Sequence, residues 1–250
     1  MEEYINCAMD IGEQMLLSGA EVHRVEESIS RMCTAFGAAR TDIFIITSSM
    51  VLTVYTQDNR SYTQTRRING MSTDYEKLHK LNALSRHICK EKMDVQQIQA
   101  ELAAAIHRKV YPFWLECISY ALIAGAFTAF FGGKVSDVLV SLFVGAIVRF
   151  GILLCETAIP NKIFSKFFSA VVATLLAFAA VSWGLIENVD KVIIGNIMSL
   201  IPGIGLTNAL RDLFTGDSIA GLLRSIEAVL TALAIAAGYF LVAFLGGFAL

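Results

Sequence analysis

Five long apolar stretches in the second part of the chain constrain its fold more than any other feature. Their approximate bounds are 113–131, 138–154, 167–186, 192–206 and 226–245. A helix needs about 20 mostly apolar residues to cross the hydrocarbon core of a bilayer, with about 17 as the lower limit. The stretch over 192–206 is short and is interrupted by Asn196, Pro202 and Gly203, whereas the others are long enough. The sequence therefore predicts a helical transmembrane domain over residues 111–250 with five spans.

Charged residues are concentrated before the apolar stretches. Residues 1–110 hold 13 of the 20 Lys and Arg residues and 14 of the 22 Asp and Glu residues. Over the whole chain 17% of residues are charged and 55% are hydrophobic, whereas a soluble domain carries about 25% charged residues. This composition excludes a disordered chain and argues against an ordinary soluble enzyme. The net charge of −2 shows no basic excess, so we expect no nucleic-acid partner.

The first 110 residues have the pattern of an α+β domain. Apolar residues at helical spacing predict helices over 22–36 and 78–88, and Asp94 is placed to cap another. β-Branched and aromatic residues predict three strands, over 42–49, 50–57 and 61–68. We expect the helices to pack on one face of a small antiparallel sheet. The predicted fold class is thus a membrane protein with a cytosolic α+β domain, 1–110, followed by a five-helix transmembrane domain.

Lysine and arginine residues near the span ends give the expected orientation. If the first 110 residues are cytosolic, four cations that flank the spans also fall on the cytosolic side, namely Lys162, Lys166, Arg211 and Arg224. Only Lys134 and Lys191 fall outside. Cytoplasmic loops of membrane proteins carry such an excess of Lys and Arg. The acidic N-terminus lacks the apolar region of a signal peptide. We therefore expect a multi-pass protein in a lipid bilayer, with its N-terminal domain in the cytoplasm.

Four charged residues lie in or beside the predicted spans. They are Glu116, Arg149, Arg224 and Glu227, and the expected topology puts all of them in the inner half of the membrane. A charge at the centre of a spanning helix costs about 2.5–3.5 kcal/mol, so such groups are usually paired or functional. One hypothesis is a cytosol-facing vestibule in which Arg149 binds a substrate carboxylate and Glu116 or Glu227 carries a proton. The alternative is a structural Glu116–Arg149 pair, with the charges of the fifth span reaching the membrane surface.

The segment SLIPGIGLTNALRDLFTGD, residues 199–217, interrupts the fourth span. Pro202 lacks a backbone N–H donor, and Gly203 loosens the helix further. Broken spans are tolerated where they face a cavity, and in transporters they often mark the binding site. A simpler alternative is a stop at the end of a short span, followed by a helix in the membrane interface.

Two segments at opposite ends of the chain resemble the threonine/serine exporter family. One is LLSGAEVHRVEESISRMCTAFG, residues 16–37, and the other is the segment 199–217. The matched positions are Ser18, Gly19, Glu21, Arg24 and Glu26 in the first segment and Pro202, Gly203, Asn208, Arg211 and Asp212 in the second. The second set, with Asn196 and the four charged residues of the spans, makes up the candidate substrate or proton pathway. For the charged residues of the first set, the alternatives are an ion network on one helix or a solvated helix face.

The resemblance covers nearly the whole chain and implies a secondary exporter of small polar metabolites in the bacterial inner membrane, driven by the proton motive force. Full-length members of the family carry further spans. The chain is therefore similar to the first half of a split exporter that needs a small membrane subunit as its partner. It resembles the two-subunit succinate exporter as well. The implied substrate is threonine, serine or a dicarboxylate, and the implied assembly is an oligomer.

Other kinds of chemistry have little support in the sequence. His23 has Glu26 and Glu27 one turn away, but one histidine with two carboxylates is a weak metal site. The sequence contains no P-loop and no GxSxG motif, and its five cysteines form no CxxC pair. We expect no metal, no cofactor and no enzymatic activity. The alternatives from other classes are a membrane-tethered enzyme and a membrane-tethered sensor that binds a metabolite.

Overall fold

The computed structural model describes residues 1–70, 72–91, 93–107, 111–158 and 161–246. The chain divides into two compact units, and each unit is made from two segments. The first unit contains Met1–Lys109 and Ile204–Ser225, and the second contains Val110–Gly203 and Ile226–Leu250. The single division expected near residue 110 leaves 204–225 with the spans, whereas this segment belongs to the first unit.

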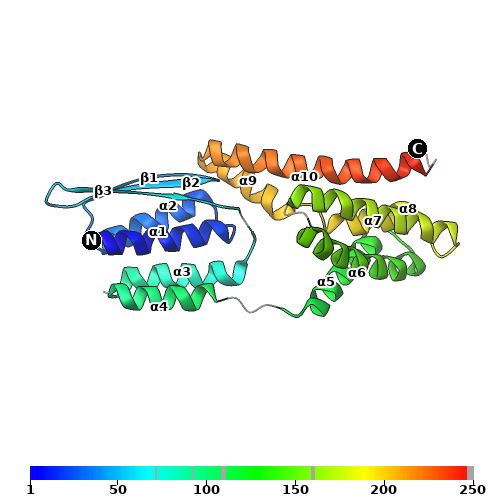
Figure 1. Ribbon diagram of the computed structural model, residues 1–250, viewed down its shortest axis with the longest axis horizontal. Coiled ribbons are helices and arrows are strands. Elements are labelled where there is room, and N and C mark those ends of the chain that lie inside the picture. Colours follow the sequence, from blue (N-terminus) through cyan, green and yellow to red (C-terminus); the bar gives the residue numbers. More distant parts are fainter. Residues whose placement is uncertain (71, 92, 108–110, 159–160, 247–250) are drawn as a thin grey trace. The chain divides into compact units, whose positions relative to one another are not determined.

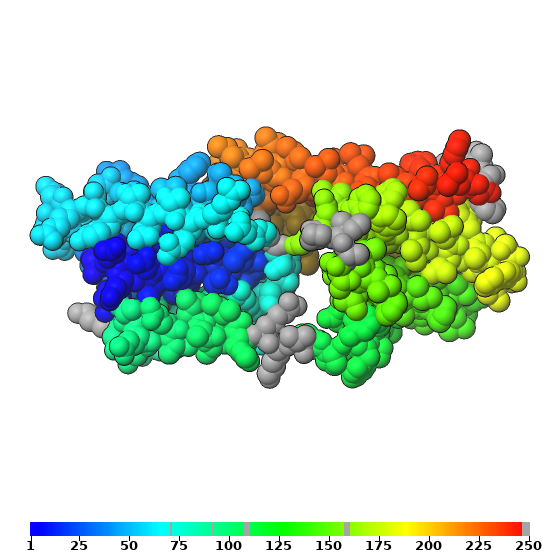
Figure 2. Space-filling model, in the orientation of Figure 1, coloured from blue at the N-terminus to red at the C-terminus, as the bar shows by residue number. Residues whose placement is uncertain are grey.

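The first unit holds a three-stranded sheet with helices on one side of it (Figure 1). Its elements are, in chain order, α1 (Glu2–Leu17), α2 (Val22–Ala35), β1 (Arg40–Ile46), β2 (Ser49–Tyr55), β3 (Ser61–Arg67), α3 (Tyr75–Lys90), α4 (Val95–Ile106), α9 (Gly203–Thr215) and the start of α10 (Ser218–Leu245). Helix α1 contacts β2 and β3 on one side and α3 and α4 on the other. Figure 2 shows α1, in dark blue, between the cyan sheet residues and the green helices α3 and α4.

The sheet confirms the three strands that the sequence predicts. Its order is β1-β2-β3, and both strand pairs are antiparallel. Met50, Leu52 and Val54 of the central strand are fully buried, and they alternate with less buried residues. This alternation arises because successive side chains of a strand point to opposite faces, and only one face meets the helices. Asn59, with a φ of 60°, supplies the left-handed residue of the turn between β2 and β3.

Local sequence signals explain where the helices of the first unit begin and end. Asp94 caps α4 as expected, because its carboxylate accepts from the Gln97 backbone N–H at 2.7 Å while the Gln97 side chain accepts from the Asp94 N–H at 3.1 Å. Helix α1 ends before Gly19, whose φ is +88°. A Cβ at this position would also lie 3.0 Å from the Ser72 carbonyl oxygen, so the turn into α2 requires glycine.

The second unit is a bundle of apolar helices. It contains α5 (Phe113–Phe130), α6 (Val135–Ala158), α7 (Lys162–Ser182), α8 (Val189–Met198) and the larger part of α10. Small residues let the helices approach closely, since a Cβ at Gly145 of α6 would lie 2.8 Å from the Tyr120 carbonyl oxygen of α5. Large apolar side chains point outward instead, and Phe130, Phe143 and Phe244 are 79%, 69% and 86% exposed. Such surfaces suit lipid rather than water.

Four helices of the described residues are long and apolar enough to cross a membrane, namely α5, α6, α7 and α10. Helices α8 and α9 pass the same test only together, as a bent pair broken at 199–202, which would make a fifth span. The predicted spans follow these helices in order, except that α10 begins at Ser218 rather than near residue 226. The chain fits a membrane protein, and the number of five spans stays a prediction.

Candidate functional site

The two segments that the sequence analysis singled out at opposite ends of the chain meet within the first unit. The Asn208 side chain of α9 donates from Nδ2 to the Gly19 carbonyl oxygen at 3.1 Å. The Asp212 carboxylate accepts from the Val22 backbone N–H at 3.2 Å. Arg224 of α10 donates from Nη2 to the Ala20 carbonyl oxygen at 3.0 Å. We call this set of contacts, between residues 19–22 and residues 208–224, the motif junction.

The motif junction completes the N-terminus of α2. The first backbone N–H groups of a helix have no partner within the helix, and a nearby carboxylate both accepts from them and balances the positive end of the helix dipole. The residue before α2 is Glu21, whose side chain makes no capping hydrogen bond. Asp212 takes that role from a position 190 residues away along the chain. The sequence places carboxylates in both motifs, and the structure shows that Asp212 is the one at the start of α2.

Asp212 and Arg224 form a buried ion pair at the centre of the motif junction. Arg224 Nη1 lies 2.6 Å from Asp212 Oδ2, and the two side chains are 5% and 0% exposed. Helices α9 and α10 come close enough for this pair because Gly221 lacks a side chain. A Cβ there would lie 2.8 Å from the backbone oxygen of Ala209 and 2.8 Å from the backbone nitrogen of Leu213. Burying two charges is costly unless their hydrogen bonds are also satisfied, so the surrounding backbone contacts are part of the pair.

Other residues of the two motifs make contacts of their own. Arg211 forms an ion pair with Glu21, and that pair is partly exposed, so it contributes little to stability. Ser18 is buried and donates to the Gln14 carbonyl oxygen at 2.7 Å, which closes the last turn of α1. Pro202 and Gly203 lie where α8 ends and α9 begins, in agreement with the break expected there. Their part in a substrate pathway stays a prediction.

Glu26 is the one motif residue with a strongly perturbed carboxyl group. The pKa of Glu26 is raised to about 6, mainly by burial and further by the negative charge of Asp217. A hydrogen bond from the Ile45 backbone and the charge of His23 lower the pKa, but by less. Asp217 lies between α9 and α10, and its buried Oδ2 has no hydrogen-bond partner in the part of the chain that the structure describes. Asp217 is not among the residues predicted from the sequence, although it ends the segment 199–217. Glu26 therefore changes its charge near neutral pH.

Arg24 takes no part in the motif junction. Its Nε donates to Asn82 Oδ1 of α3 at 3.2 Å, and it lines a pocket between α2 and α3. An ion network was one of two alternatives for Glu21, Arg24 and Glu26, and the three side chains do not form one cluster. Glu21 pairs with Arg211, Arg24 faces α3, and Glu26 lies near Asp217.

Glu116 and Arg149 pair within the second unit, as one of the two hypotheses for them requires. Arg149 Nε donates to Glu116 Oε2 at 2.9 Å, and Arg149 Nη2 contacts the same oxygen. The guanidinium carbon of Arg149 also lies 5.3 Å from the centre of the Phe113 ring and 5.8 Å from that of Tyr120. Arg149 Nη1 is buried and has no hydrogen-bond partner among the described residues. The pair thus leaves one donor group of the arginine unused.

Asn196 belongs to a buried polar cluster of α5, α6 and α8. Its Nδ2 donates to Ser141 Oγ at 2.9 Å, and Thr128 Oγ1 lies 2.6 Å from the same hydroxyl. Its Oδ1 has no hydrogen-bond partner among the described residues. Sequence analysis recognised Asn196 as an interruption of an apolar stretch but missed Thr128 and Ser141, because isolated hydroxyl residues are common in spanning helices.

The last candidate, Glu227, is exposed on α10 in the second unit. Arg224, one turn earlier, belongs to the first unit. Of the four charged residues expected in one vestibule, Glu116 and Arg149 pair with each other in the second unit, and Arg224 pairs with Asp212 in the first. Within the described residues there is no group of three or more His, Cys, Asp or Glu side chains that could hold a metal ion.

Comparisons with known proteins match almost the whole chain. The model of the family described as "Putative threonine/serine exporter" matches residues 6–246. A Mycobacterium tuberculosis protein named "Probable threonine/serine exporter" is 28% identical over 239 residues, which are 94% of this chain and 44% of that protein. A Klebsiella aerogenes protein named "Probable succinate transporter subunit YjjP" is 23% identical over 235 residues, which are 94% of this chain and 89% of that protein. The chain thus spans less than half the length of the mycobacterial relative. No solved structure matches it.

Proposed function

The chain belongs to the threonine/serine exporter family, and we propose that it is a subunit of a secondary transporter that exports small carboxylate-bearing metabolites from the cytoplasm. Its relatives bear the names of transporters and not of enzymes. A membrane location agrees with the four apolar helices and the bent pair. The bacterial inner membrane, and a cytoplasmic place for the N-terminal residues, are parts of the proposal that the distribution of Lys and Arg supports.

The observation that carries the proposed substrate class is the state of Arg149. It is a guanidinium in a membrane-capable helix, and its side chain is only 14% exposed. Glu116 balances its charge through Nε and Nη2, so the arginine is stable without a ligand. The buried Nη1 has no partner among the described residues and is left to donate to a carboxylate. A carboxylate is the one group that amino acids and dicarboxylates share.

Threonine or serine is the first candidate substrate, because the family and the mycobacterial relative carry those names. A dicarboxylate such as succinate is the alternative. It is favoured by the similarity to the Klebsiella subunit, which this chain covers over most of its length. That relative is named a subunit, and we therefore propose that a second membrane protein completes the transporter. We further propose that proton uptake by Glu116 or Glu227 couples transport to the proton motive force.

Efflux from bacterial cells that lack their own exporters tests the proposal. The chain is expressed alone and together with its candidate membrane partner, and the loss of labelled threonine and labelled succinate is followed. Efflux of one compound, with the partner required, is the expected result and identifies the substrate. If neither compound leaves cells in which both proteins are in the membrane, the proposed substrate class is wrong.

Two variants separate the role of Arg149 in binding from its role in stability. Arg149→Lys keeps the positive charge for Glu116 but removes the two-nitrogen fork, so we expect insertion to persist and efflux to fall at least about tenfold. Lys134→Gln is the matched control, because it removes another cation of the second unit. The ion pair of Lys134 with Glu187 is exposed and contributes little to stability, so this variant should transport normally. Wild-type efflux by an inserted Arg149→Lys protein would remove Arg149 from the substrate site.

The proposed proton route is tested separately. If the pH dependence of efflux is unchanged in both Glu116→Gln and Glu227→Gln, neither carboxylate carries the coupled proton.

A further inference from the structure

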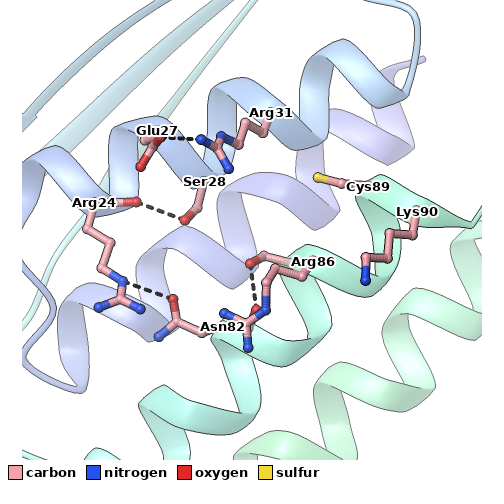
Figure 3. Close-up of a pocket in the computed structure, with 9 residues that line it drawn as sticks. Arg24, Glu27, Ser28, Arg31, Asn82, Arg86, Cys89 and Lys90 are labelled. Carbon is pink, nitrogen blue, oxygen red and sulfur yellow. Dashed lines mark hydrogen bonds and ion pairs between the residues drawn. The ribbon is translucent and has the colours of Figure 1, made fainter.

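A pocket of about 350 Å³ lies between α2 and α3, entirely within the first unit. Figure 3 shows that one wall comes from α2 and the other from α3. Pockets that hold small ligands begin at about 300 Å³, so this one suits a compact metabolite. It is separate from the motif junction, because no residue of the junction lines the pocket. Along α2, Val22 belongs to the junction and Arg24 lines the pocket.

Positive charge dominates the walls of this pocket. Its cations are Arg24, Arg31, Arg86 and Lys90, and its only carboxylate is Glu27. Glu27 pairs with Arg31 at 2.5 Å, and that pair is exposed. No ion pair joins Arg86 or Lys90 to another residue of the part that the structure describes. Glu27 balances one of these four charges, and the other three cations around one small space repel one another, so a bound anion would relieve a repulsion that the pocket's own carboxylate does not.

The floor of the pocket is polar and fixed in place. Asn82 and Ser85 are buried, and Ser28 is half-buried. Asn82 Oδ1 accepts from Arg24 Nε at 3.2 Å, which holds that guanidinium at the pocket edge. Asn82 Nδ2 donates to the Leu78 carbonyl oxygen at 2.7 Å, and the Ser85 hydroxyl donates to the Asn82 carbonyl oxygen at 3.0 Å. A solvated helix face has no need of such a buried support for an arginine.

We propose that this pocket binds a small, multiply charged oxyanion, with its carboxylate or phosphate groups held by Arg24, Arg86 and Lys90. Arginine presents paired N–H donors that match the oxygens of both groups, and lysine adds a mobile positive charge. A neutral zwitterion such as threonine lacks the charge to replace the missing counter-ions. The site lies outside the second unit, so the proposal does not depend on which compound is transported.

Cys89 provides a reporter within the pocket. Its side chain is exposed and lines the cavity. The purified full-length chain in detergent is treated with a thiol-alkylating reagent, and modification of Cys89 is followed by peptide mass spectrometry. Citrate and inorganic phosphate are added in separate series, each compared with chloride at the same ionic strength and with threonine. We expect citrate, phosphate or both to slow the alkylation of Cys89 in a saturable way, whereas chloride and threonine do not.

Matched variants connect the protection to the pocket cations. In Arg86→Gln/Lys90→Gln, the concentration for half-protection should rise about tenfold or more, because charged hydrogen bonds are lost. Arg60→Gln/Arg67→Gln removes two exposed arginines outside the pocket and should protect as the wild type does. The unfolding temperature of each variant checks that it is folded.

The relative strength of the two anions identifies the ligand. Protection at lower phosphate than citrate concentration indicates a phosphate-bearing ligand, and the reverse indicates a carboxylate. The proposal is overturned if neither anion protects Cys89 beyond chloride, or if the folded Arg86→Gln/Lys90→Gln variant is protected like the wild type.

Discussion

Replacing Asp212 with asparagine tests whether the motif junction holds the first unit together. Asparagine keeps the shape of the side chain and an oxygen that can accept from the Val22 N–H, so the substitution removes only the negative charge. Arg224, with 5% of its side chain exposed, then stays buried without its ion-pair partner. Breaking a buried pair in this way costs about 3–5 kcal/mol. Since the hydrogen bond to Val22 is retained, we expect a value near the lower end, about 3 kcal/mol.

Hydrogen exchange of the full-length protein in detergent measures this loss directly. A cost of about 3 kcal/mol raises the population of the open junction more than about 100-fold, so the amides at the start of α2 should exchange faster by that factor. Glu27→Gln is the matched control, because it removes the carboxylate of an exposed pair with Arg31 on the same helix. Exposed pairs contribute at most about 1 kcal/mol, so this control should change the exchange by less than about fivefold.

A double variant tests the reason for the loss. In Asp212→Asn/Arg224→Met both charges are gone, and we expect part of the lost protection at Val22 to return, because no buried charge is left alone. Less than a threefold change in exchange for Asp212→Asn would refute the reasoning. So would a double variant that is less protected than the single one.

Three other predictions follow from residues described above. The pKa of Glu26 in the folded protein is about 6, above its ordinary value of 4.5. The stability that the protonated Glu26 contributes is therefore complete below pH 4.5 and is lost as the pH rises through 6. Between pH 4.5 and pH 7.5, the free energy of unfolding of the wild type should fall by about 1 kcal/mol more than that of Glu26→Gln, after allowance for partial exposure of the side chain. Gly221→Ala places a Cβ against the Ala209 backbone and should lower the free energy of unfolding by about 1–3 kcal/mol. Gly151→Ala is the control, because the new Cβ meets open space and should not destabilise the protein. Equal unfolding temperatures for the two variants would contradict this prediction. Asp94→Ala removes the carboxylate that accepts from the Gln97 backbone N–H at the start of α4 and should cost about 1 kcal/mol, and faster hydrogen exchange confined to α4 would support it.

The parts of the fold that depend on neighbouring residues were predictable. β-Branched and aromatic residues over 50–57 and 61–68 predict two strands separated by three residues, and β2 and β3 form and pair there. Asp94 precedes an apolar helical pattern with Gln97 in the third position, and the capping box is present. In each case the residues that interact lie close together in the chain, so the pattern that predicts the structure can be seen in a single sequence.

The motif junction was not predictable in the same way. Resemblance singled out Gly19 and Asp212, but no local pattern says that these segments touch across 190 residues of chain. The absence of a local signal also explains why α10 begins earlier than the sequence predicts. Arg224 has the charge typical of a residue that flanks a span, and the sequence alone does not show that it is buried against Asp212 within a longer helix. The division of Glu116, Arg149 and Arg224 between two pairs likewise depends on tertiary contacts.

The capping of α2 by Asp212 has a consequence for the order of events during synthesis. The ribosome makes Val22 long before it makes Asp212, and at about 5–20 residues per second the interval is roughly 10–40 s. During that time α2 exists without its carboxylate, and helices α5 to α8 are made in between. The first unit is therefore completed only after four helices of the second unit, α5 to α8, have been made. A ribosome that stalls before residue 212 therefore leaves an N-terminal unit in which the Val22 N–H lacks its carboxylate acceptor.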